Sequence, residues 1–204
     1  KIEVIYLASN INKKEALLSR DTEKIPFKDF LLFVGKRWGY KNFENLIKVY
    51  ANSNQLKKDF KIVCFGGGEF SKSEKENFAS LKLDQKNIIQ TFGDDSILCQ
   101  LYKNARALIY PSLYEGFGLP ILEAMSLNCA VICGNTSSMT EVGGSAVLYF
   151  DPNNLDEMTK VIKQNIYSNQ TLDNFINLGK ERAKFFSWEK CGKETLDCYN
   201  QVIS

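Results

Sequence analysis

The sequence has 204 residues, of which 44% are hydrophobic, and this is enough for one large α/β domain with its own core. Its 26 Lys and Arg residues face 24 Asp and Glu residues, and the net charge of +2 excludes the broad basic face of a nucleic-acid-binding protein. Histidine is absent, and the six cysteines include no Cys-x-x-Cys pair, which excludes the usual zinc sites. We therefore expect reduced, structural thiols in a cytosolic protein.

The length of the apolar runs and the first residues of the chain bear on membrane insertion, export and domain boundaries. No apolar run is long enough to cross a bilayer, and KIEVIYLASN begins with strand-like residues rather than with a charged leader. Because the chain starts at Lys1 and enters a strand-like run at once, we expect a soluble domain excised from a longer chain.

Short runs rich in Ile, Val, Phe and Leu alternate with amphipathic stretches, which predicts βαβ units and a parallel sheet flanked by helices. The predicted strands are 2–6, 30–34, 60–65, 88–92, 107–110, 130–133 and 146–149. After Asp151-Pro152 the pattern becomes purely helical, with a last helix starting near Trp188. The polar segment 10–29 is interpreted as a mobile connection between the first strand and the main sheet.

The most informative stretch is 107–125, ALIYPSLYEGFGLPILEAM, in which a strand leads into a glycine-containing loop and then into a helix. Gly116 and Gly118 let a ligand approach the backbone, and the free N–H groups of Gly118 and Leu119 at the helix start favour an anion such as a diphosphate. A tight turn uses the same glycines for steric reasons alone, so both interpretations stay open for this motif.

Two carboxylates frame this loop, Glu115 at its beginning and Glu123 eight residues later on the helix. A carboxylate accepts hydrogen bonds from neighbouring hydroxyls, so Glu123 fits a ribose diol and Glu115 fits the hydroxyls of a sugar. The alternatives are a favourable acid near a helix N-terminus for Glu123 and a solvated loop residue for Glu115. The apolar neighbours Tyr114 and Phe117 favour a functional role for Glu115.

PSLYEGFGLPILEAM resembles the signature of the family 4 glycosyltransferases of GT-B fold, which carry an E-x7-E motif at the positions of Glu115 and Glu123. FLLFVGKRWGYKNFENLI, KIVCFGGGE and NIIQTFGDDSILCQLYKNARALIYPS resemble the family's preceding segments in the same order, and the likeness continues to about residue 203. The resemblance implies a Rossmann-like domain that binds a nucleotide-diphosphate sugar, linked to UDP or GDP, in a retaining transfer for polysaccharide biosynthesis.

Three basic residues follow the strand 30–34 in a glycine-containing loop, where they fit a diphosphate and the charge that builds on it during transfer. These are Lys36, Arg37 and Lys41. The family usually has an Arg five residues before a Lys; Lys36 has that spacing to Lys41 and Arg37 stands beside it, so either fits the Arg role. Gly66 to Gly68 form the next loop, which fits either a close donor approach or a plain turn.

For the nucleobase, the resemblance implies backbone contacts at Thr91, Phe92 and Gly93 and an apolar wall at Ile97 or Leu98, for which core packing is the alternative. The predicted site comprises, as catalytic residues, Glu115, Lys41 and Arg37, and, as nucleotide-sugar-binding residues, Lys36, Gly67, Phe92, Leu98, Gly116, Phe117, Gly118, Leu119 and Glu123. The resemblance implies no metal and no cofactor beyond the donor substrate.

The predicted organisation is a linker region at 1–29, a nucleotide-sugar-binding domain at 30–186 and, at 187–204, a helix that packs toward an N-terminal acceptor-binding half. This half is the expected partner, and we expect the domain to be inactive without it. The resemblance also implies a cytoplasmic location at the inner face of the membrane, with peripheral association through the missing half.

Three other functions are alternatives to sugar transfer. A nucleotide-sugar 2-epimerase of GT-B fold reuses the diphosphate site, but the E-x7-E motif with its basic loop favours transfer. A noncatalytic nucleotide-sugar-binding module is disfavoured by the intact Glu115, Glu123 and Lys41. A redox Rossmann domain lacks Gly-x-Gly-x-x-Gly after its first strand.

Overall fold

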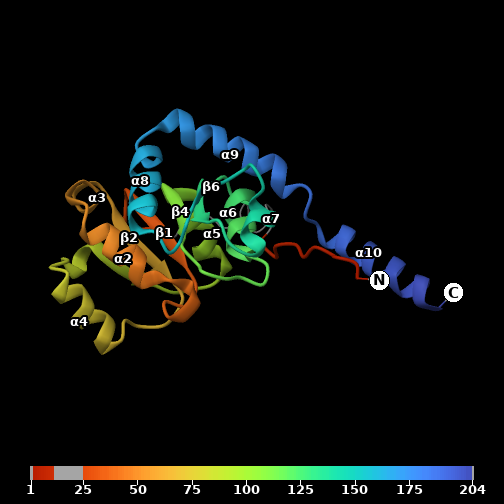
Figure 1. The fold of residues 1–204 in the computed structure, drawn as a ribbon, viewed down its shortest axis with the longest axis horizontal. Helices are drawn as coiled ribbons and strands as arrows, with labels where there is room; N and C mark the ends of the chain where they lie inside the picture. The colour runs from red at the N-terminus through yellow and green to blue at the C-terminus, as the bar shows by residue number, and fades with distance from the viewer. Residues whose placement is uncertain (1, 12–24, 204) are drawn as a thin grey trace.

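The computed structural model describes residues 2–11 and 25–203. It contains a six-stranded sheet in the order β3-β2-β1-β4-β5-β6, and all five neighbouring pairs are parallel. The strands are β1 (Phe30–Val34), β2 (Lys61–Phe65), β3 (Ile88–Thr91), β4 (Ala107–Tyr110), β5 (Val131–Gly134) and β6 (Leu148–Phe150). The predicted parallel α/β fold is confirmed, and Figure 1 shows the sheet between its helices.

Helices cover both faces of the sheet, because each strand is apolar on both sides. Alternate residues of β1 belong to two separate cores: Phe30 and Leu32 pack under α5 (Asp95–Asn104), α6 (Leu119–Ser126) and α7 (Ser138–Gly143). Leu31 and Phe33 pack under α2 (Phe43–Ala51), α3 (Asn54–Asp59), α4 (Lys72–Ser80) and α8 (Leu155–Ile166). Two short 3₁₀ helices, η1 (Gly39–Lys41) and η2 (Gln85–Asn87), complete the connections.

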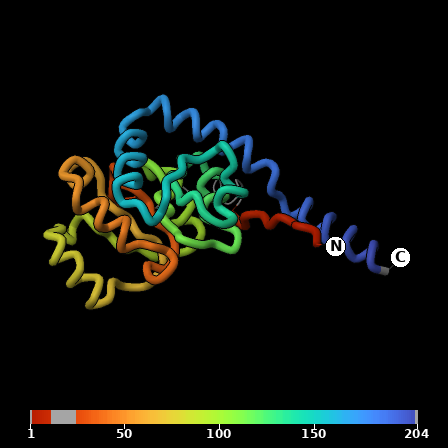
Figure 2. Tube along the Cα trace, in the orientation of Figure 1, coloured from red at the N-terminus to blue at the C-terminus, as the bar shows by residue number. Residues whose placement is uncertain are grey.

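The C-terminal part is helical, as predicted. Helix α9 (Asn169–Ala183) packs on α6, and α10 (Trp188–Ile203) projects from the body of the domain on the side where the N-terminal segment also extends (Figures 1 and 2). Side chains on α10 are largely exposed, including Leu196 at 59%, Tyr199 at 63% and Val202 at 81%. Among residues 2–11 and 25–203, no helix combines the length and apolarity needed to span a membrane.

The N-terminal segment differs from the prediction. The run 2–6 forms no strand, because its backbone lies beside no strand of the described sheet, and Ile2 and Val4 are exposed at 94% and 68%. Further along this segment the Tyr6 ring packs against Phe117 and Phe186, and Ala8 and Ile11 are buried. Most of the predicted mobile connection, residues 12–24, lies outside the described residues.

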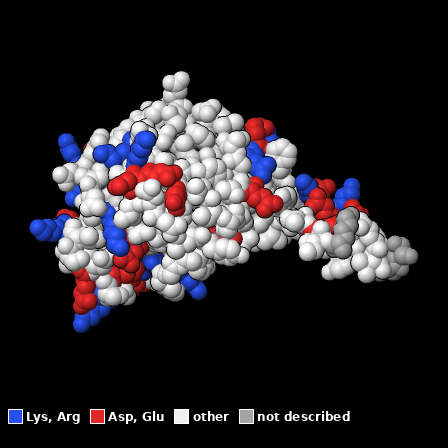
Figure 3. All heavy atoms as spheres, in the orientation of Figure 1, with Lys and Arg blue, Asp and Glu red and all other residues white. Residues whose placement is uncertain are grey.

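Charged side chains are unevenly distributed over the face of the domain that Figure 3 shows. On the face in Figure 3, blue and red side chains lie mainly toward the edge of the domain and on the projecting C-terminal part, around a wide uncharged area. None of the six cysteines, all of which lie in the described residues, forms a disulfide bond with another. Cys129 is buried, and burial raises the pKa of its thiol to about 12.

Candidate functional site

The candidate site lies at the switch point of the sheet. The chain runs outward from β1 to β2 and β3, then crosses back to place β4 on the other side of β1. In such sheets, ligands bind outside the carboxyl ends of the strands where the order reverses. The loops after β1 and β4 meet there, with Leu113 N donating to Tyr40 O at 2.7 Å. These loops carry the predicted basic residues and the first predicted carboxylate.

Lys41 and Glu115 are brought together at this point. Lys41 Nζ donates to Glu115 Oε1 at 2.8 Å and to Tyr110 OH at 2.8 Å. The two charged side chains are only 12% and 10% exposed, so the pair is largely removed from water. Glu115 is therefore not a solvated loop residue. A buried ion pair beside a strand end offers both a cation for a phosphate and a carboxylate for hydroxyls.

The backbone of Glu115 is fixed by the loop that follows β5. Glu115 N lies 2.9 Å from Ser137 Oγ, to which it donates, and Ser138 Oγ donates to Glu115 O at 2.9 Å. The hydroxyls of Ser137 and Ser138, at the start of α7, thus hold the Glu115 backbone through both its N–H and its carbonyl. Further along α7, the Glu141 carboxylate accepts a hydrogen bond from Tyr6 OH at 2.6 Å.

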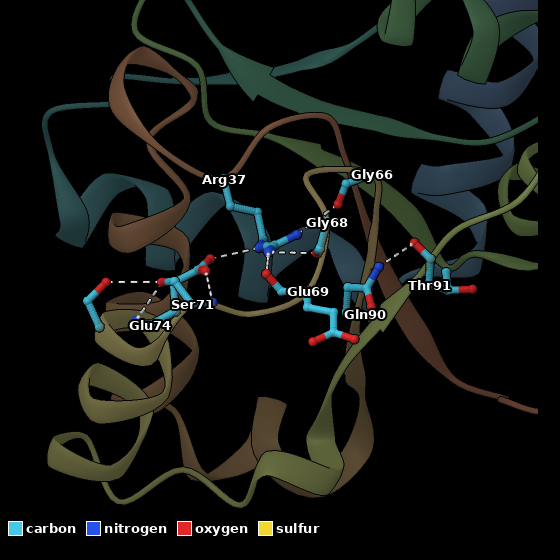
Figure 4. A network of polar contacts seen from close by, with 9 residues as sticks. Arg37, Gly66, Gly68, Glu69, Ser71, Glu74, Gln90 and Thr91 are labelled. Carbon is cyan, nitrogen blue, oxygen red and sulfur yellow. Dashed lines mark hydrogen bonds and ion pairs between the residues drawn. The ribbon is translucent and has the colours of Figure 1, made fainter.

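Arg37 holds two loops together (Figure 4). Its Nε donates to Glu74 Oε1 at 2.7 Å, and its terminal nitrogens donate to the carbonyls of Gly66, Gly68 and Glu69 at 2.7, 2.9 and 3.0 Å. These bonds use four of the five guanidinium N–H groups. The arginine, with a side chain 1% exposed, is thus engaged by the protein itself. Its catalytic role stays a prediction.

The glycine loop after β2 is shaped around this arginine. A Cβ added at Gly67 would lie 2.7 Å from Arg37 Nη1 and 3.1 Å from Gly35 O, and Gly67 has φ of +76°. The Ser71 hydroxyl and Glu74 form a capping box at the start of α4, which also fixes the carboxylate that receives Arg37 Nε. Gly67 is therefore required by close packing, whichever ligand approaches it.

Lys36 differs from its neighbour Arg37, which the protein itself engages. It is exposed, with its Nζ 5.6 Å from the centre of the Trp38 ring. Within the described part of the chain it makes no hydrogen bond or ion pair, so its ammonium is available to an anion. Of the two neighbours that fit the family's Arg position, Lys36 is the one whose charge is not already used.

In the loop before α6, one of the two predicted glycines adopts a conformation that favours glycine, and the anion site itself stays a prediction. Gly118 is the N-cap with φ of +95°, a left-handed conformation that favours glycine, and Pro120 stands in the first turn. Leu119 begins the helix and is 38% exposed, whereas Phe117 packs against Phe186 with ring centres 6.0 Å apart. Gly116 has an ordinary φ and open space at its Cβ position, so no steric demand explains this glycine.

Glu123 lies one turn further along α6, facing α5. Tyr102 OH donates to Glu123 Oε2 at 2.8 Å. Burial raises the pKa of Glu123; the hydrogen bond from Tyr102 opposes this rise and the charge of Asp95 adds to it. No described contact joins Glu123 to Lys41 or Glu115, so its role in the same ligand site stays a prediction.

The nucleobase residues separate into two groups. Phe92, at the end of β3, is 76% exposed, and Ile97 helps to line a cavity of about 280 Å³ with Thr91 and Leu101. Leu98 points into the core and is 7% exposed. Core packing thus accounts for Leu98, and Ile97 is the residue of the pair that offers an apolar wall.

The sequence pattern does not identify two buried tyrosines as neighbours of the predicted site residues. Tyr102 and Tyr110 each hydrogen-bond a predicted site residue, yet each stands in an apolar run that indicates core. Their only signal is a polar atom on an otherwise buried side chain, which needs a partner.

Comparison with known proteins identifies the family. The family model described as glycosyl transferases group 1 matches residues 16–182. The chain belongs to this family. As a group 1 glycosyltransferase it is 45% identical over 105 residues to O-antigen chain mannosyltransferase B of Escherichia coli, a match that covers 52% of the chain and 28% of that protein. It is 31% identical over 166 residues to O-antigen chain mannosyltransferase RfbU of Salmonella typhimurium, covering 80% of the chain and 44% of that protein.

Solved structures show the same fold. Sucrose-phosphate synthase from Thermosynechococcus elongatus matches with a TM-score of 0.79 at 19% identity, over 98% of this chain and 52% of that one. This group 1 glycosyltransferase chain thus spans less than half the length of the two mannosyltransferases it resembles and about half of the synthase.

Proposed function

We propose that this chain is the donor-binding domain of a retaining glycosyltransferase, which transfers a hexosyl group from a UDP- or GDP-linked sugar during glycan assembly. The observation that carries the proposal is the buried Lys41–Glu115 pair at the switch point of the sheet. The family match over residues 16–182 supports it.

Each part of the donor meets suitable chemistry at this edge. Lys36 and Lys41 neutralise the charge of the diphosphate, and the backbone N–H groups at the start of α6 donate hydrogen bonds to its oxygens. Glu115 accepts hydrogen bonds from the hydroxyls of the donor sugar, and Glu123 from those of the ribose. As the bond between the sugar and the diphosphate breaks, the same cations stabilise the charge left on the diphosphate, so the proposed transfer uses no metal. The acceptor oxygen attacks the face from which that group departs.

The two named relatives are mannosyltransferases, and this favours a mannosyl donor as the first substrate to test. The nucleotide, UDP or GDP, is decided at the β3 edge, where Phe92 and the cavity beside Ile97 lie.

The acceptor is proposed to bind an N-terminal half beyond this chain. The chain spans 44% of the Salmonella relative, which leaves room for a second domain of similar size. Region 1–29 then serves as linker, 30–186 as donor domain and 187–204 as the helix that packs on the other half, consistent with the projecting α10 and its exposed Leu196 and Val202. Transfer requires both halves, and we place the enzyme in the cytoplasm, at the inner face of the membrane.

A binding titration tests the proposal. UDP, GDP and their mannose conjugates are titrated into the wild-type chain and into Glu123→Ala, Lys36→Ala and Glu76→Ala. Loss of a charge-assisted hydrogen bond should weaken nucleotide binding by about 10- to 100-fold in the first two variants. Glu76 lies exposed on α4 and serves as the control, for which we expect no change.

Equal affinity of the wild type and Glu123→Ala would contradict the role of that carboxylate. Transfer from donor to acceptor by the full-length protein separates a transferase from an epimerase, which converts the donor without any acceptor. A noncatalytic module shows binding without either reaction.

A further inference from the structure

Two buried tyrosines each hold one of the side chains proposed to contact the donor. Tyr110 is the last residue of β4, and its hydroxyl accepts from Lys41 Nζ at 2.8 Å. Tyr102 lies on α5, and its hydroxyl donates to Glu123 Oε2 at 2.8 Å. Both tyrosines have an exposed fraction of 0%. The two contacts lie on the diphosphate side and the ribose side of the proposed donor site.

Burial makes these hydroxyls fixed and neutral. Both rings belong to the core between the sheet and helices α5, α6 and α7, and a tyrosine has only two rotatable side-chain bonds, so the ring position determines that of the oxygen. Burial raises the pKa of both phenols far above the ordinary value for tyrosine. Each hydroxyl is thus a neutral group at a set position, rather than a charge that competes with the ligand.

The contacts leave the donor-facing atoms free. An ammonium has three N–H groups, and Lys41 uses two of them on Tyr110 and Glu115, which leaves one for a phosphate oxygen. Glu123 receives Tyr102 on Oε2, and within the described part of the chain no other side chain donates to its carboxylate. Oε1 therefore remains for a ribose hydroxyl.

We propose that Tyr102 and Tyr110 are positioning residues for two different parts of the nucleotide. Tyr110 orients Lys41 toward the diphosphate, and Tyr102 orients Glu123 toward the ribose hydroxyls. This inference rests on the proposed function, because it assigns the two tyrosines to the same donor site. Neither hydroxyl touches the reacting atoms.

The test uses Tyr102→Phe and Tyr110→Phe, which keep the ring and remove the hydroxyl. The matched control is Tyr50→Phe: Tyr50 is equally buried, and its hydroxyl donates to Phe60 O at 2.7 Å in the core on the other face of the sheet. Thermal unfolding checks that each variant is folded. The probes are UDP and GDP, together with the 2′,3′-dideoxy form of whichever nucleotide the wild type binds more tightly, titrated by calorimetry.

We expect Tyr110→Phe to bind the ribose and dideoxy nucleotides about 5- to 10-fold more weakly, to the same degree, because the loss lies at the diphosphate. Tyr102→Phe should bind the ribose form about 5- to 10-fold more weakly and the dideoxy form unchanged. Tyr50→Phe should bind both as the wild type does. In a Lys41→Met background, Tyr110→Phe should have no further effect, because the residue it positions is gone.

A Tyr102→Phe loss that is equal for the ribose and dideoxy forms overturns the assignment of Tyr102. An undiminished effect of Tyr110→Phe in the Lys41→Met background overturns that of Tyr110. Unchanged affinities in both variants, with clear binding by the wild type, overturn this inference and leave the proposed function standing. Absence of binding by the wild type to either nucleotide overturns both.

Discussion

Lys41 Nζ lies 2.8 Å from Glu115 Oε1, although 74 residues of chain separate them. The pair closes the gap between the loops after β1 and β4, at the point where the order of the strands reverses. Because both side chains are nearly buried, each charge depends on the other for its compensation.

Lys41→Met should destabilise the fold by about 3 kcal/mol, because it leaves the Glu115 carboxylate buried without a counter-charge. Lys48→Met is the control: the Lys48–Glu44 pair has the same 2.8 Å separation but is exposed at 38% and 66%, so its loss should cost less than about 1 kcal/mol. Urea denaturation measures both. Adding Glu115→Gln to Lys41→Met should recover part of the lost stability, and equal losses in the two single variants would show that burial of the pair has no energetic consequence.

Gly67→Ala should destabilise the protein more than Gly68→Ala. The two glycines have nearly the same φ, +76° and +73°, so the left-handed backbone costs each alanine about 1–2 kcal/mol. Only at Gly67 does the added Cβ meet Arg37 Nη1, at 2.7 Å, whereas at Gly68 nothing lies within 4 Å. We expect an additional ~1–3 kcal/mol for Gly67→Ala, as is typical of overpacking. Chemical denaturation compares the two variants, and indistinguishable midpoints would mean that Arg37 moves aside freely.

Glu123→Gln should raise the stability of the fold at neutral pH. Burial raises the pKa of Glu123, so the ionised form is disfavoured in the folded state, and the penalty is present at every pH above the folded pKa. As pH falls through that pKa the carboxyl takes up a proton, and the penalty is fully removed below about pH 4, the range in which an unfolded glutamate also protonates. The stability difference between the variant and the wild type should therefore shrink on acidification. Melting temperatures at a series of pH values measure it, and a difference that grows toward acid would have the wrong sign.

Nucleotide affinity should fall over the same pH range. The proposed ribose contact needs the ionised Glu123, so wild-type binding should weaken as pH drops through the raised pKa, beginning above the range of an ordinary glutamate. Titration of the wild type and Glu123→Gln with the same nucleotide separates this effect from others, because the variant should lack the transition. A transition of the same size in both proteins would assign it to another group.

Ile97→Ala and Leu98→Ala should have opposite consequences. Leu98 is buried in the core, so its truncation should cost about 2–4 kcal/mol in unfolding free energy and leave nucleotide affinity unchanged. Ile97 lines the 280 Å³ cavity beside Thr91, so its truncation should weaken nucleotide binding with a smaller loss of stability. Unfolding free energies and nucleotide affinities measured on both variants decide which residue forms the apolar wall of the nucleobase site. Weaker binding in Leu98→Ala alone would assign the wall to Leu98, as in the site predicted from the sequence.

Much of the fold could be predicted because it depends on local patterns. Apolar runs such as 30–34 and 107–110 form strands in the predicted places, since each is buried on both sides by amphipathic helices that the same sequence supplies. The run 2–6 has the same pattern and forms no strand, because a strand also needs a neighbour for its backbone, and a pattern in one segment does not reveal whether that neighbour exists.

By itself, the sequence determined the family, the parallel order of strands and helices, and the loops in which the charged residues of the candidate site stand. Tertiary structure alone decided that the Arg37 guanidinium is engaged by the protein whereas the neighbouring Lys36 is exposed, because the carbonyls that engage Arg37 come from a loop about 30 residues away. It also decided that the buried hydroxyls of Tyr102 and Tyr110 contact Glu123 and Lys41. Spacing along a chain specifies which face a side chain occupies, whereas the partner of a buried polar atom is fixed only when distant segments pack together.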